Sequence, residues 1–160
     1  AVGTSSVRFQ DTAPTSTVFS VGTGGEVNGS GNSIIAYCFA EKTGYSKFGS
    51  YVGNGNVDGT FVYCGFKPAW IMIKRSSSSG DDWYIFDSAR DTDNTVDKFL
   101  YPNGSASEGT ISPSLDFLSN GFKWRKASAF SPVNADGATY IYMAFGQSIV
   151  GSNNVPAVAR

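Results

Sequence analysis

The chain contains no histidine, and only 16% of its 160 residues are charged. Without histidine it lacks the commonest general base, the commonest metal ligand and every Ser–His or Cys–His nucleophile pair. A net charge of −1 offers no attraction to nucleic acid or to an anionic membrane. No apolar run approaches the roughly 20 residues of a membrane-spanning helix. We therefore expect a protein that is not an enzyme, uses no cofactor, binds no nucleic acid and does not insert into a membrane.

Cysteine is also scarce, with only Cys38 and Cys64 in the chain. Both lie inside apolar, strand-like runs, AYCFA and VYCGF, so the favoured interpretation is that both are small buried hydrophobic side chains. A disulfide between neighbouring strands is the alternative. Two isolated cysteines without a CxxC motif do not predict a metal site.

The chain is rich in aromatic residues and glycine, with 12 Phe, 8 Tyr, 3 Trp and 19 Gly, and 41% of its residues are hydrophobic. Apolar residues alternate with period two in several stretches, and no stretch has a convincing helical period. The predicted strands are 33–41, 45–53, 60–66, 69–75, 82–90, a short one near 98–101, 115–118, 122–126 and 138–148. Eight or nine short strands predict an all-β fold, an antiparallel β-sandwich resembling a jelly roll.

Turn residues separate the later strands. Asn120-Gly121 stands between the apolar runs 115–118 and 122–124, which is the strongest short-range signal for a β-hairpin. Residues 102–114 are rich in glycine, serine and proline, and predict a long, weakly ordered loop.

The start of the chain repeats its end. VNGSGNSIIAYCFA at 27–40 aligns without gaps to VNADGATYIYMAFG at 133–146, at an offset of 106 residues. Chance similarity between two β-strands is one explanation, because such sequences carry little information. The favoured interpretation is that residues 1–40 are the terminal part of a preceding related unit, whose last strand pairs with the next domain. Residues 41–160 would then form one complete sandwich with a polar tail.

Several acidic residues are candidates for chemistry. Asp87 and Asp116 could in principle hydrolyse a glycoside, but neither lies in an apolar stretch that would raise its pKa for general-acid work. Asp91, Asp93 and Asp97 have the spacing of the first half of a calcium loop. That tract lacks the glycine and the closing glutamate of such loops, so a polar turn is favoured over a calcium site.

Aromatic residues beside polar ones suggest a surface for sugars, since rings can stack on sugar faces while polar groups bind the hydroxyls. The glycan-binding candidates are Trp83, Tyr84, Asp87, Arg90, Trp124 and Arg125. Alternation places Trp83 and Ile85 on one face of a strand and Tyr84 and Phe86 on the other, so one of the two pairs must belong to the core. For any single aromatic residue here, a place in the core is favoured over a binding role.

Several ordered motifs carry a resemblance to a known family. They are YSKFGSYVGNGNVDGTFVYCGFKPAWIMIKR, WYIFDSARD, VDKFLYPNGSASE, DFLSNGFKWR and ATYIYMAFGQ. Together with the ending VPAVAR, they resemble a repeated β domain of marine tailed-phage tail-fibre and virion proteins, over roughly residues 27–160. The resemblance implies a virion protein, in a tail fibre or similar appendage, and carries over no catalytic residues.

The function expected from the resemblance is that of a structural and adhesive virion domain, the C-terminal part of a fibre that contacts a glycan or protein of the host surface. Its expected partners are further copies of itself, as a homotrimer, or other virion proteins. The alternative is a capsid decoration or filament-forming protein without a ligand. A polysaccharide depolymerase is the minor alternative.

Overall fold

The structure is a computed structural model that describes residues 6–127 and 131–147. The chain divides into two compact units, Val2–Phe39 and Ala40–Arg160. This division lies beside the boundary that the internal repeat predicts at residue 40. The assignment of residues 1–40 to a preceding copy stays a prediction.

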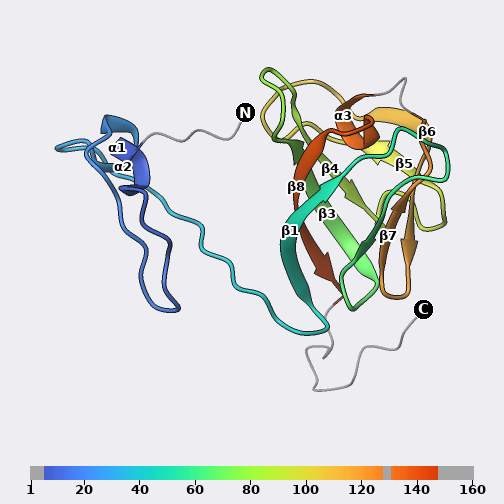
Figure 1. Ribbon diagram of the computed structural model, residues 1–160, viewed down its shortest axis with the longest axis horizontal. Helices are drawn as coiled ribbons and strands as arrows, with labels where there is room; N and C mark the ends of the chain where they lie inside the picture. Colours follow the sequence, from blue (N-terminus) through green and yellow to red (C-terminus); the bar gives the residue numbers. More distant parts are fainter. Residues whose placement is uncertain (1–5, 128–130, 148–160) are drawn as a thin grey trace. The chain divides into compact units, whose positions relative to one another are not determined.

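The larger unit is an antiparallel β-sandwich of two four-stranded sheets (Figure 1). The first sheet has the order β1 (Ser46–Val52), β8 (Thr139–Gly146), β3 (Pro68–Arg75) and β4 (Trp83–Asp87). The second has the order β2 (Phe61–Tyr63), β7 (Gly121–Trp124), β6 (Gly109–Leu118) and β5 (Val96–Phe99). The predicted all-β sandwich is therefore confirmed.

The two sheets meet along one side of the sandwich and are separate along the other. β4 and β5 are edge strands of different sheets, but Ile85 and Leu100 exchange two main-chain hydrogen bonds of 3.0 and 3.1 Å beside them. On the other side the edges are β1 and β2, where the Thr60 hydroxyl donates to the Val52 carbonyl at 2.7 Å. No ladder of main-chain bonds joins these two strands in the described part of the chain.

The core lies between the sheets and consists largely of aromatic rings. Trp124 and Phe86 are both fully buried, and their rings meet edge to face with centroids 5.7 Å apart. Tyr51 of β1 stacks on Tyr140 of the paired strand β8 at 4.9 Å. Ile71 and Ile73 of β3 complete the inner face of the first sheet, and both are fully buried. Period-two alternation thus directs one face of each strand into a shared core.

The hairpin predicted around Asn120-Gly121 is confirmed, since β6 pairs with β7 from Leu118↔Gly121 onward. Glycine is needed at position 121 for close packing of β7 on β2, because a Cβ there would lie 2.1 Å from the Val62 carbonyl oxygen of β2. The prediction of a loop over 102–114 is wrong in its second half, where β6 already begins at Gly109. Lys98 and Phe99 of β5 pair with Thr110 and Gly109 and so order this segment.

The smaller unit contains two short helices, α1 (Ser6–Phe9) and α2 (Gly25–Asn28). The predicted strand over 33–41 is wrong, because residues 33–41 form no strand and make no ladder hydrogen bonds in the structure. Its apolar side chains are exposed, among them Ile35 at 77% and Tyr37 at 81%. An alternating pattern indicates that a segment can form a strand, but a strand forms only where the segment can pair with the edge of another strand.

A third four-residue helix, α3 (Ser131–Asn134), precedes β8 and carries a buried asparagine. The Asn134 side chain accepts the N–H of Asn54 at 3.2 Å and donates to the carbonyls of Asn56 and Lys126, both at 3.0 Å. It therefore joins the loop after β1 to the end of β7. Helices this short give no periodic signal, so the sequence does not reveal them. No helix within the described residues is long and apolar enough to span a membrane.

The aromatic core gives a direct test of this architecture. Phe86→Ala should lower the free energy of unfolding by about 3–5 kcal/mol, because it leaves a cavity among the rings that surround this side chain. Phe61→Ala is the matched control, since Phe61 is 43% exposed and its loss should cost well under about 1 kcal/mol. Urea unfolding followed by tryptophan fluorescence measures both, and equal effects would contradict the assigned core.

Candidate functional site

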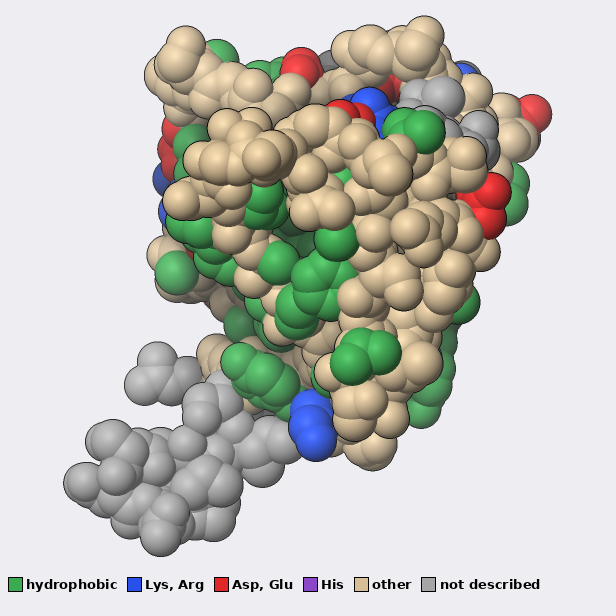
Figure 2. All heavy atoms as spheres, turned by 90° about the vertical axis from the view of Figure 1, so that its left-hand side faces the viewer, with side chains coloured by type: hydrophobic (Ala, Val, Ile, Leu, Met, Phe, Trp, Pro, Cys, Tyr) green, Lys and Arg blue, Asp and Glu red, His purple; other side chains and the backbone are tan. Residues whose placement is uncertain are grey.

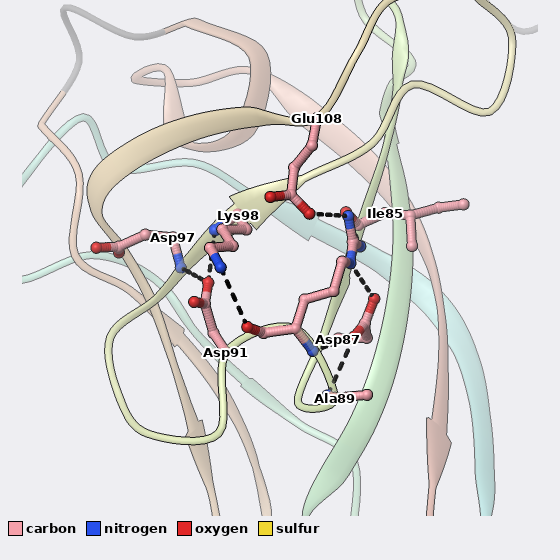
Figure 3. Close-up of polar contacts among 8 residues, drawn as sticks. Ile85, Asp87, Ala89, Asp91, Asp97, Lys98 and Glu108 are labelled. Carbon is pink, nitrogen blue, oxygen red and sulfur yellow. Dashed lines mark hydrogen bonds and ion pairs between the residues drawn. The ribbon is translucent and has the colours of Figure 1, made fainter.

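A polar network surrounds the loop after β4, and Figure 3 draws its contacts. The Asp87 carboxylate accepts the N–H groups of Ala89 at 3.0 Å and Arg90 at 2.9 Å, which folds the chain into a tight turn. The Arg90 guanidinium binds the same carboxylate at 2.6 Å, the Ile85 carbonyl at 3.3 Å and the Glu108 carboxylate at 3.6 Å. Since Arg90 and Asp87 are occupied with each other and are mostly buried, they hold the loop and offer little to a ligand.

The acidic tract of residues 91–97 binds main-chain groups. Asp91 accepts the N–H groups of Asp97 and Lys98 at 2.8 and 2.7 Å, while Asp97 accepts the N–H of Ser114 at 3.0 Å. Asp93 is exposed and accepts the neighbouring Thr92 hydroxyl at 3.3 Å. Within the described ranges no three His, Cys, Asp or Glu side chains form a group that could hold a metal ion. The structure therefore shows the three calcium candidates in a hydrogen-bonded loop and not as a set of ligands.

Two of the predicted glycan-binding aromatics belong to the core. Tyr84 is 5% exposed and Trp124 fully buried, so neither ring is available to a sugar. The alternating pattern correctly predicted that one face of β4 belongs to the core. The structure shows that this face holds Tyr84 and Phe86. The inner face could not be chosen from the sequence because it depends on which strands of the other sheet lie opposite.

Trp83 lies on the outer face of the first sheet, half-buried beside three polar groups. Its main-chain N–H donates to the Asn103 side-chain oxygen at 2.9 Å, and the Asn103 amide donates to Asp82 at 2.9 Å. The Lys74 ammonium lies 5.7 Å from the centroid of the indole ring. We call Trp83, Asp82, Asn103 and Lys74 the Trp83 patch. It combines a ring with an amide, a carboxylate and an ammonium group, the set of groups that can bind a sugar.

Arg125, the remaining glycan candidate, forms an ion pair of 2.5 Å with the largely buried Asp116. Asp116 faces outward from β6 of the second sheet, whereas Asp87 faces outward from β4 of the first. The two carboxylates therefore lie on different sheets and share no cleft. The paired carboxylates that glycoside hydrolysis requires are not formed by these residues.

A hollow of about 300 Å³ lies where the turn 41–47 meets the end of β2, residues 63–65. On its rim Glu41 accepts the Lys47 ammonium at 2.9 Å and the Phe48 N–H at 3.2 Å, and both contacts lower the pKa of the Glu41 carboxyl. Cys64 is buried in its wall, and desolvation raises the pKa of its thiol to about 12. The sequence did not reveal this hollow, because nothing in the local pattern indicates that the turn 41–47 and β2 lie side by side in the fold.

The two cysteines differ in the structure. Cys64 is buried as predicted, but Cys38 is exposed, and both are free thiols. The prediction of a buried Cys38 is wrong because the strand that would have buried it is not formed.

The fold and these networks define an antiparallel β-sandwich domain whose described polar groups mainly hold its loops. A family model described as a domain of unknown function, DUF7483, matches residues 1–148. The chain belongs to this family. No curated protein and no solved structure matches the chain.

The loop network predicts a measurable contribution from Arg90. Arg90→Gln should lower the free energy of unfolding at neutral pH by about 1–3 kcal/mol, because it leaves mostly buried carboxylate and carbonyl groups without their partner. Lys47→Gln removes an ion pair whose two side chains are 40% and 49% exposed, and should leave stability unchanged within error. Urea titrations compare the two variants, and a null effect of Arg90→Gln would show that solvent replaces the network.

The cysteines can be distinguished chemically. At pH 8 a thiol reagent should modify Cys38 rapidly and Cys64 only on unfolding, since the buried thiol forms too little thiolate to react. The readout is the number of thiols labelled over time in the native protein. Cys38→Ser should abolish the fast phase, and a fast phase that survives this change would refute the burial of Cys64.

Proposed function

We propose that this domain is a non-catalytic structural and adhesive part of a phage tail fibre or similar virion appendage that contacts glycans on the host surface. The observation that carries the adhesive part is the Trp83 patch. Of the three aromatic residues predicted to bind glycan, Trp83 alone lies outside the core; it is half-buried on the outer face of β4, beside the polar groups of Asn103 and Lys74. The virion setting comes from the sequence resemblance.

The face drawn in Figure 2 is consistent with this role. Charged side chains are sparse on the face drawn in Figure 2, where hydrophobic side chains lie among polar atoms. A surface of this kind suits neutral partners such as glycans and contacts between copies of one chain. Of the acidic residues considered for hydrolysis, Asp87 binds Arg90 and two main-chain N–H groups and Asp116 binds Arg125, which favours display over catalysis.

The test is binding of the full chain to an array of bacterial surface glycans, with Trp83→Ala and Tyr45→Ala as a matched pair. Trp83→Ala should weaken binding about tenfold or more, because a stacking ring in a binding site carries much of the affinity. Tyr45 is also an aromatic residue at the surface of the first sheet, 39% exposed, but it precedes β1 at the opposite end of that sheet. Its replacement should not change glycan binding.

Other outcomes separate the alternative functions. A complete lack of binding to glycans and host cells would remove the adhesive role and favour the capsid-decoration or filament alternative. Release of reducing sugar ends from host polysaccharide, lost in Asp87→Asn or Asp116→Asn, would contradict the non-catalytic assignment.

A further inference from the structure

The hollow beside the turn 41–47 lies on the open side of the sandwich. β1 and β2 are the edge strands of the two sheets on this side, and the described residues form no ladder of main-chain bonds between them. The hollow is bounded by the turn before β1 and by residues 63–65 at the end of β2. Its volume of about 300 Å³ is at the lower end of the range for small-molecule sites, so it has the size for one small ligand.

The charges around the hollow leave the Lys42 ammonium without a counter-ion. Glu41 and Lys47 neutralise each other at 2.9 Å, and Glu41 also accepts the Phe48 N–H at 3.2 Å. The ammonium group of Lys42 forms no ion pair or hydrogen bond with any residue that the structure describes. With two lysines and one glutamate, the lining carries a net charge of +1. The hollow therefore favours an anionic ligand.

The turn itself supplies main-chain donors. The Lys42 carbonyl accepts the N–H groups of Tyr45 and Ser46, both at 2.9 Å, which places Thr43 and Gly44 at the tip of the turn. Within the described part of the chain, the N–H groups of Thr43 and Gly44 donate no hydrogen bond. Gly44 has a left-handed backbone conformation, with φ of +77°. Successive N–H groups in turns of this kind form concave sites that bind anions.

The β2 side of the hollow adds an aromatic ring and a wall without charge. Tyr63 is the last residue of β2, and its side chain is 64% exposed. Cys64 is buried behind it, and burial raises the pKa of its thiol to about 12. The thiol thus stays protonated at neutral pH and does not repel an anion. An exposed ring beside a cationic turn can hold a sugar, because the C–H face of the sugar stacks on the ring.

We propose that the hollow binds the carboxylate-bearing ring of an acidic sugar, such as a uronic acid. The carboxylate accepts hydrogen bonds from the Lys42 ammonium and from the N–H groups of Thr43 and Gly44, while the sugar ring lies on Tyr63. The choice of a sugar rests on the proposed adhesive function. The preference for an anion rests on the lining of the hollow alone.

This site is separate from the Trp83 patch. Ser46, which lines the hollow at the start of β1, pairs with Phe145 of β8, and Phe145 pairs with Trp70 near the start of β3. Trp83 pairs with Lys74 near the end of β3. The two sites therefore lie at opposite ends of the first sheet, and a substitution in one should leave the other intact.

The first experiment titrates the ¹⁵N-labelled full chain with methyl glucuronide and with methyl glucoside, followed by NMR. The two sugars differ only in having a carboxylate or a hydroxymethyl group on the same carbon. The glucuronide should shift the amide resonances of Thr43 and Gly44 and bind about fivefold more tightly or better, because it adds a charge-assisted hydrogen bond. Raising the salt concentration from about 0.05 to about 0.5 M should weaken its binding, since salt screens the lysine.

The second experiment repeats the titration with two pairs of variants. Lys42→Gln should weaken glucuronide binding about fivefold or more, through loss of the charged donor. Lys67→Gln is its control, because Lys67 is an exposed lysine between β2 and β3 that does not line the hollow. Tyr63→Ala should weaken the binding of both sugars. Phe61→Ala is its control, since Phe61 is 43% exposed on the same strand and also lies outside the lining.

Contrary results overturn the proposal at different points. Equal affinity for the two sugars, or unchanged affinity in Lys42→Gln, removes the anion site, and amide shifts confined to residues outside 41–47 and 63–65 exclude the hollow. Acetate that binds as tightly as the glucuronide overturns the assignment to a sugar. Glycans that bind through Trp83 while no glucuronide binds would leave the proposed function standing and refute this site. Glucuronide binding at the hollow with no effect of Trp83→Ala on glycan binding would support this site and refute the Trp83 patch.

Discussion

The structure depends on the burial of one group of aromatic rings between two sheets. Trp124 of β7 is fully buried and contacts Phe86 of β4, Phe122 of its own strand and Tyr51 of β1, with ring centroids 5.7, 6.0 and 6.3 Å away. Sheets packed face to face lie about 10 Å apart, a gap that interlocking rings fill well. Because the rings occupy the interior, only the outer faces, the loops and the edges of the sandwich are open to a partner.

Most of the polar residues described above form hydrogen bonds that hold the loops between the strands. Asp87 and Asp91 each accept two main-chain N–H groups, and Asn134 joins two distant loops from a buried position. Side chains that satisfy main-chain groups in this way make long connections rigid. A rigid sandwich with fixed loops is suited to presenting surface groups such as Trp83 in constant positions.

The local pattern predicts most of this fold but not its pairings. Alternation correctly placed strands near β1, β3, β4 and β8, since each has one face in the core. It could not choose between Trp83 and Tyr84 as the core residue of β4, because that choice depends on Phe99 and Trp124 from the other sheet. It failed for residues 33–41, whose pattern is that of a strand but which form none. Asn134 gave no signal, because its partners lie up to 80 residues away.

The position of β8 constrains how the sandwich folds during synthesis. β1 ends at Val52 and β8 begins at Thr139, yet β8 is the strand that joins β1 to β3. A ribosome therefore has to deliver the last of the eight described strands before the first sheet can close. Until then β1 and β3 carry unpaired edges, and contacts of such long sequence separation form slowly. Late closure of the first sheet is thus built into the order of the strands.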